Sequence, residues 1–195
     1  LSLLSCISYL FTQIFFIATN SDVNEFIPYG QAQLTFENNE LNQIDFEMTG
    51  NGEWYLDCTE ANSGNCSIRS DSITHDENST ISLSVNIIDG GYMDFHYKVD
   101  SEYSTSGDEF YDGLKFYING ILEEQFQPST NGSSPWEHYE IYLQSGVYNF
   151  SWSYVKDSAD GNTSSDIDCA WIDDLFIPLS EPLFYEYYNF AIINS

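Results

Sequence analysis

Two carboxylate-rich segments contain the residues of this sequence best suited to chemistry. Asp173 and Asp174 interrupt an apolar segment near the C-terminus, and Asp45 and Glu47 lie in a shorter apolar segment upstream. An unpaired carboxylate is costly to bury, so each segment needs a hydrogen-bond donor or a metal. Because the first and last strands of a sandwich often pair, we expect a structural calcium between Glu47 and Asp173 or Asp174. Asp45, Asn51 and backbone carbonyls would complete it.

The charge balance favours cations as partners. The chain has 31 Asp and Glu but only 4 Lys and Arg, which gives a formal net charge of -27. This charge repels nucleic acid and anionic membranes, and it raises the local concentration of cations. Carboxylates without Lys or Arg partners are natural calcium ligands. The alternative is that the acidic surface serves solubility or adaptation to high salt.

Catalytic patterns are scarce. The histidines are His75, His96 and His138, and none has a second ligand at metal spacing. The sequence has no Gly-x-Ser-x-Gly elbow and no phosphate-binding loop. Acidic pairs such as Glu137 and Glu140 arise freely among so many acids, and a glycoside hydrolase needs two that face each other across a cleft. We therefore expect a protein that is not an enzyme.

The cysteines and Asn-x-Ser/Thr triplets favour export. Cys58 and Cys66 bracket a short polar loop and are expected to form a disulfide, whereas Cys169 has no sequence partner and should pack in the core. Five triplets fit the N-glycosylation pattern, at Asn65, Asn78, Asn131, Asn149 and Asn162.

The chain divides into three parts. Residues 1–20 are apolar and suit a signal peptide or another N-terminal hydrophobic segment; an uncleaved anchor and a true strand are the alternatives. Residues 21–180 have the size of one sandwich domain. Residues 181–195 are an aromatic C-terminal extension or linker.

Period-two alternation indicates an all-β domain. Short segments rich in Ile, Val, Phe, Tyr and Trp are separated by Gly, Asn, Asp and Ser. We expect strands over 33–36, 43–47, 54–56, 79–87, 91–100, 112–118, 121–127, 137–143, 146–156 and 170–178. Asn119-Gly120 between apolar residues predicts a two-residue hairpin turn. The pattern therefore predicts a two-sheet antiparallel sandwich.

Several blocks in fixed order resemble a domain of prokaryotic surface proteins. These are DFEMTG at 45–50, SIRSDSI at 67–73, GYMDFHYKVDSE at 91–102, YDGLKFYING at 111–120, YLQSGVYNFSWSYVKD at 142–157 and AWIDDLFIP at 170–178. Together they resemble the MAM-like, concanavalin-like jelly roll and are similar to the cleaved-adhesin domains of gingipain-type proteases.

The resemblance implies a secreted or cell-surface module for adhesion or carbohydrate binding, with structural calcium. Related modules place metal ligands at positions that match Glu47 and Asp173 or Asp174. The partner would be a glycan or a cell-surface protein. The alternative is a structural subunit of a filament or surface layer, assembled when the N-terminal segment adds a strand to a neighbour. The Cys58–Cys66 loop and the insertion before Trp136 depart from the family pattern.

Overall fold

The protein is a sandwich of two antiparallel sheets, which confirms the predicted fold class. The computed structural model describes residues 14–15, 29–37, 40–102, 109–128, 132–158 and 167–180. The first sheet, here the β7 sheet, has the order β4 (Trp54–Asp57), β5 (Ser67–Ser70), β12 (Cys169–Ser180), β7 (Gly91–Asp100) and β10 (Glu137–Leu143). The second, the β6 sheet, has the order β3 (Glu47–Gly50), β6 (Asn78–Ile87), β11 (Gly146–Val155), β8 (Gly113–Ile118) and β9 (Ile121–Phe126).

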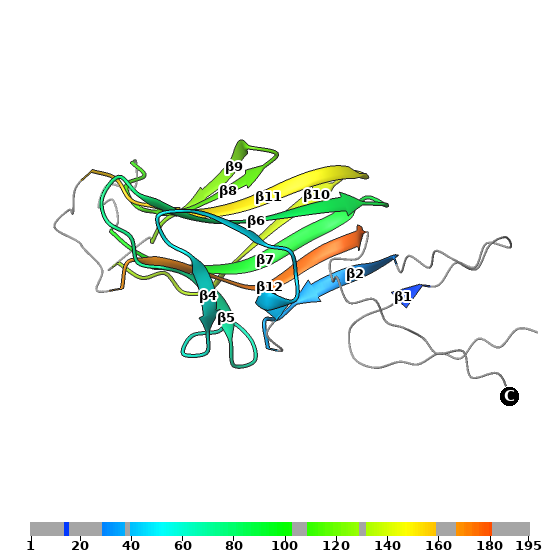
Figure 1. Ribbon diagram of the computed structural model, residues 1–195, viewed down its shortest axis with the longest axis horizontal. Helices are drawn as coiled ribbons and strands as arrows, with labels where there is room; N and C mark the ends of the chain where they lie inside the picture. Colours follow the sequence, from blue (N-terminus) through cyan, green and yellow to red (C-terminus); the bar gives the residue numbers. More distant parts are fainter. Residues whose placement is uncertain are drawn as a thin grey trace, which may run out of the picture.

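The strand order is that of a jelly roll. From β5 to β12 the chain crosses repeatedly between the two sheets, giving β5-β12-β7-β10 in one and β6-β11-β8-β9 in the other. Figure 1 shows the two layers, and it shows β12 beside β2 (Tyr29–Leu34), although these strands come from opposite ends of the domain. The pair Ser180 and Ile87 joins the sheets at one point.

The core lies between the sheets and is rich in aromatic residues. The ring centroid of Phe95 on β7 lies 5.1 Å from that of Phe116 and 5.6 Å from that of Trp152, both from the opposite sheet. All three side chains are at most 1% exposed. The expected inward face of β7 is confirmed, because Met93, Phe95, Tyr97 and Val99 are all buried.

The predicted Asn119-Gly120 hairpin is confirmed. Ile118 pairs with Ile121, and both turn residues have positive φ, 53° for Asn119 and 76° for Gly120. This is the backbone form that a two-residue turn between twisted strands requires.

The N-terminal part of the domain differs from the prediction. Residues 43–46 do not form the predicted strand: they follow a 3-10 helix (Glu40–Asn42), and the strand begins at Glu47, as β3, which pairs with β6. β12 pairs with β2 and β5 along one edge and with β7 along the other, and the strand β5 was missing from the pattern-based set. Alternation is weak where a strand pairs along only a few residues, which explains both errors.

Most of the two predicted terminal segments falls outside the described residues. Of residues 1–20, only Ile14–Phe15 is described, as the short strand β1 that pairs with β2. Residues 181–195 lie outside the described residues. No helix among the described residues is both long and apolar enough to span a membrane.

Candidate functional site

The expected calcium ligands do not come together. Glu47 is exposed on β3 and pairs with Ser82 in the β6 sheet, whereas Asp173 is fully buried on β12 and lies opposite His96 in the β7 sheet. Asp45 is exposed, and Asn51 accepts a hydrogen bond from the Asn78 backbone, 3.3 Å away. The last strand pairs with β2, whereas β3, which holds Glu47, pairs with β6, so the strand pairing from which the site was inferred is not found; calcium binding by these residues stays a prediction.

Asp173 and Asp174 instead hold the loop between β4 and β5. The backbone N–H groups of Asn62 and Ser63 donate to Asp173 Oδ2 at 2.8 and 3.1 Å. The Asn62 amide and the Ser63 hydroxyl donate to Asp174 at 2.8 and 2.7 Å. Burial raises the pKa of Asp173 to about 6, although these backbone donors act against the rise. Hydrogen-bond donors therefore satisfy the carboxylates that the sequence assigned to a metal.

The same loop is closed by a disulfide, as the spacing predicted. Cys58 and Cys66 are bonded. From the other side, Glu37 accepts hydrogen bonds from the backbone N–H groups of Asn65 and Cys66 at 2.6 and 2.8 Å, and these bonds lower the pKa of Glu37. The expected burial of Cys169 is also confirmed, and burial raises the pKa of its thiol to about 12. The loop is thus covalently closed and fixed to the sheet.

Aromatic and cationic side chains alternate across the outer face of the β7 sheet. Tyr55, Arg69, Trp171 and Lys98 are successive partners on β4, β5, β12 and β7. The Arg69 guanidinium lies 5.7 Å from the Tyr55 ring and 5.4 Å from the Trp171 ring, and the Lys98 ammonium lies 5.3 Å from Trp171. These are cation–π distances. We call this row the cation–π ladder.

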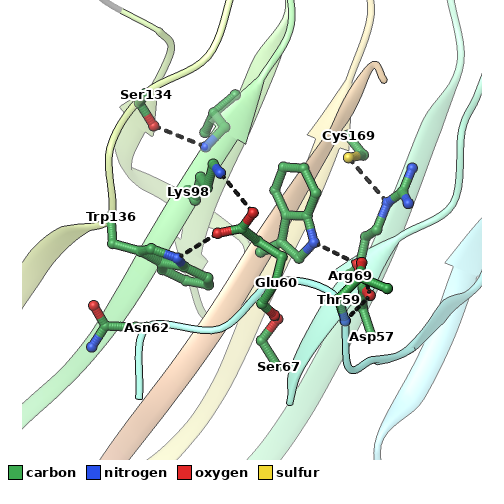
Figure 2. Close-up of polar contacts among 12 residues, drawn as sticks. Asp57, Thr59, Glu60, Asn62, Ser67, Arg69, Lys98, Ser134, Trp136 and Cys169 are labelled. Atoms are coloured by element: carbon green, nitrogen blue, oxygen red, sulfur yellow. Dashed lines mark hydrogen bonds and ion pairs between the residues drawn. The ribbon is translucent and has the colours of Figure 1, made fainter. Parts of the chain in front are cut away.

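The disulfide loop covers the ladder. Figure 2 shows Glu60 between Trp136 and Lys98: it accepts from the Trp136 indole at 3.1 Å and pairs with Lys98 at 3.0 Å. The indole N–H of Trp171 donates to Asp57 at 2.9 Å, and Trp171 is only 3% exposed. An exposed row of rings would favour glycan stacking, but Trp171, the central ring of this row, is covered by the loop, and Tyr55 at the end of the row is the exposed one.

An open hollow lies beside the covered ladder on the same face. Its volume is about 460 Å³, and its lining residues are Gln33, Ser63, Asp94, His96, Asp174 and Phe176. The register places Phe176 next to Gln33 on one side and Asp94 on the other, so β2, β12 and β7 form its floor. Apart from Phe176 every lining side chain is polar, and two are carboxylates. The hollow can therefore offer several hydrogen-bond acceptors to a ligand.

Exposed tyrosines lie beyond the hollow. Tyr92 precedes Asp94 by two residues and so shares its face of β7, and its β10 partner is Tyr142. The two rings are 55% and 51% exposed and meet edge to face, with centroids 5.2 Å apart. Such a pair leaves ring surface open to a ligand.

Two histidines that the sequence left separate are neighbours on this face. His96 and His138 pair across β7 and β10, with ring centroids 4.9 Å apart. His138 lies 3.2 Å from Asp94, and His96 lies 3.8 Å from Asp174. Only the strand register could have revealed this pairing, because the two residues are far apart in the chain.

The predicted glycosylation sites differ in setting. Asn65 and Asn78 are exposed. Asn149 is half-buried on β11, where its amide donates to Ser84 at 3.1 Å. Asn131 and Asn162 lie outside the described residues. Glycosylation stays a prediction.

The chain matches no protein-family model and no curated protein sequence. Among solved structures, it is similar to the CBM22-1 xylan-binding domain of Xyn10C from Paenibacillus barcinonensis (14% identity, TM-score 0.41, 70% of this chain and 86% of that domain). It is also similar to the K1 cleaved-adhesin domain of Lys-gingipain from Porphyromonas gingivalis (11% identity, TM-score 0.49, 75% of this chain and 96% of that domain). A third similar structure is the secreted serine protease VesC from Vibrio cholerae (14% identity, TM-score 0.47, 78% of this chain and 34% of the protease chain). At these identities and TM-scores, the similarities assign neither a family nor a ligand, and the MAM and concanavalin labels stay predictions.

Proposed function

We propose that this protein is a non-catalytic module that binds an uncharged glycan on the outer face of the β7 sheet. The observation that carries the proposal is the position of the exposed Tyr92–Tyr142 pair beside the polar hollow. Sugar rings combine apolar C–H faces with a rim of hydroxyl groups, so they suit a site that offers both an aromatic face and hydrogen-bond acceptors.

The acceptors of the hollow indicate which glycans fit. Asp94 and Asp174 line it, and Glu140 lies opposite Asp94 on β10. Carboxylates accept hydrogen bonds from sugar hydroxyls, but they repel sulfated or uronic acid units. The net charge of -27 strengthens this exclusion. The proposed ligand is therefore a neutral polysaccharide or oligosaccharide.

We place this module outside the cell. The Cys58–Cys66 disulfide closes the loop that borders the hollow through Ser63. Structural disulfides persist in oxidising compartments and are rare in the cytosol. An extracellular glycan would be accessible to such a module, and adhesion to a glycan-bearing surface would be its biological role.

A glycan array with neutral and anionic polysaccharides tests this function. The proposal expects retention on a subset of neutral polysaccharides and none on sulfated or uronic acid polymers. Loss of retention in Tyr142→Ala, with Tyr55→Ala unaffected, would locate the site, because Tyr55 is an exposed tyrosine on β4 outside the hollow. Binding only to a purified surface protein, or only to anionic polymers, would overturn the glycan proposal.

A further inference from the structure

Three acidic side chains meet at one end of the sandwich. Glu102 follows β7, Asp112 precedes β8 and Asp157 follows β11, so they come from both sheets. One carboxylate oxygen of each lies within 4.8 Å of the other two. Glu102 is 7% exposed, Asp112 is fully buried and Asp157 is half-buried. We call these three residues the end cluster.

The end cluster carries more negative charge than the nearby lysine neutralises. The Lys156 ammonium lies 2.6 Å from Asp168 and 3.7 Å from Asp112 Oδ2, so its short contact is with a carboxylate outside the cluster. Like charges that share a buried site repel strongly, and burial weakens their screening. Such an arrangement needs a further positive charge.

Two buried oxygen atoms at this end lack hydrogen-bond partners among the described residues. One is Asp112 Oδ2, for which Lys156 lies beyond hydrogen-bonding distance. The other is the hydroxyl of Tyr154, a fully buried side chain on β11. Tyr154 pairs across the sheet with Leu114, two residues after Asp112, so it lies at the same end of the sandwich as the end cluster. Unsatisfied buried oxygens in such a place indicate an ion or an ordered water.

We propose that the end cluster binds one calcium ion that links the two sheets. Oxygens bound to one calcium lie about 2.3–2.6 Å from it and hence at most about 5 Å apart, which the 4.8 Å spacing fits. Calcium accepts irregular sets of carboxylates, carbonyls and water, whereas magnesium demands a regular octahedron. Because Glu102 comes from the β7 sheet and the other two ligands from the β6 sheet, the ion would hold this end of the sandwich closed.

Calorimetric titration of the chelator-treated full chain with calcium chloride tests the proposal. We expect one calcium per chain and a higher melting temperature in calcium than in chelator, because a ligand of the folded state alone stabilises it. Glu102→Gln and Asp157→Asn should each weaken calcium binding by at least about tenfold. The control is Asp89→Asn, an exposed acid next to β6, which should leave the affinity unchanged.

Terbium luminescence gives a second readout if Glu102→Gln misfolds. Terbium replaces calcium at oxygen sites, and Tyr154 beside the cluster should sensitise its emission. Asp157→Asn should lose this emission while keeping the circular dichroism of the wild type. Absence of calcium binding in the wild type, or an unchanged affinity in a folded Asp157→Asn variant, would overturn the proposal. Neither experiment involves a glycan, so the result is independent of the proposed function.

Discussion

Arg69 lies directly opposite Trp171 in the β5–β12 pairing, with its guanidinium carbon 5.4 Å from the indole centroid. Lys98 occupies the other side of the same ring at 5.3 Å. Two of the four basic residues in the chain thus flank one tryptophan. In so acidic a protein, this use of scarce cations indicates that they stabilise the face on which the disulfide loop rests.

Replacing Arg69 tests the cation–π ladder. Arg69→Met keeps much of the side-chain volume but removes the contacts with Trp171 and Tyr55 and the 3.1 Å hydrogen bond to the Cys169 sulfur. We expect the free energy of unfolding to fall by about 1–2 kcal/mol in urea denaturation. Arg69→Lys should lose less, because it keeps the charge but not the planar stacking. Equal stability of Arg69→Met and wild type would refute the contribution of the ladder.

The sequence predicted the sandwich better than the site. Alternation along residues 91–100 identified the inward face of β7 correctly, because successive side chains of a strand point to opposite faces of the sheet. The face on which a side chain lies therefore follows from its place in the strand alone. The cation–π ladder depends on which strands are neighbours, and Arg69 and Trp171 are brought together only by the register. Period-two patterns carry no information about that partner choice.

Opening the disulfide should destabilise the loop more than the sandwich. The bond closes a loop with a sequence separation of 8, for which chain entropy predicts a loss of about 2–3 kcal/mol on removal. We expect a Cys58→Ser/Cys66→Ser double variant to melt earlier but to keep its β-sheet circular dichroism. Limited proteolysis should then cut first within residues 58–66. Cleavage elsewhere at the same rate as in the loop would contradict the anchoring role of the disulfide.

Asp173 should make stability depend on pH. Its folded pKa of about 6 lies above the ordinary value of 3.8, chiefly because it is buried, and the neighbouring charge of Asp174 adds to the rise. The stabilisation linked to its proton is therefore complete below the ordinary pKa and is lost as the pH rises through about 6.

The Asp173 contribution can be isolated with Asp173→Asn, whose amide oxygen still accepts from the backbone of Asn62 and Ser63. Unfolding free energies measured in urea between about pH 5 and pH 7 should show a smaller pH dependence for this variant than for wild type. Asp89→Asn serves as the control and should follow the wild type. A pH dependence that is identical in Asp173→Asn and wild type would show that Asp173 contributes none of it.

The sequence argument for calcium at Glu47 and Asp173 left out one kind of partner for a buried carboxylate. It assumed that adjacent acids in a strand need a cation, but the Asn62 and Ser63 backbone supplies the donors to Asp173. Every residue type except proline has a backbone N–H, so the sequence does not reveal which loop residues donate hydrogen bonds to a buried carboxylate. The end cluster escaped notice because its members are scattered between Glu102 and Asp157, each at the end of a different strand.

Glycan binding is tested most directly by titrating the best neutral polysaccharide from the array into matched tyrosine variants. We expect Tyr142→Ala to lose affinity by at least about fivefold, since stacking on an exposed ring contributes roughly 1 kcal/mol or more and anchors the sugar beside the hollow. Tyr55→Ala should bind like the wild type. Equal affinity of Tyr142→Ala and wild type would contradict the account, because the ligand would then lie away from the Tyr92–Tyr142 pair and the hollow.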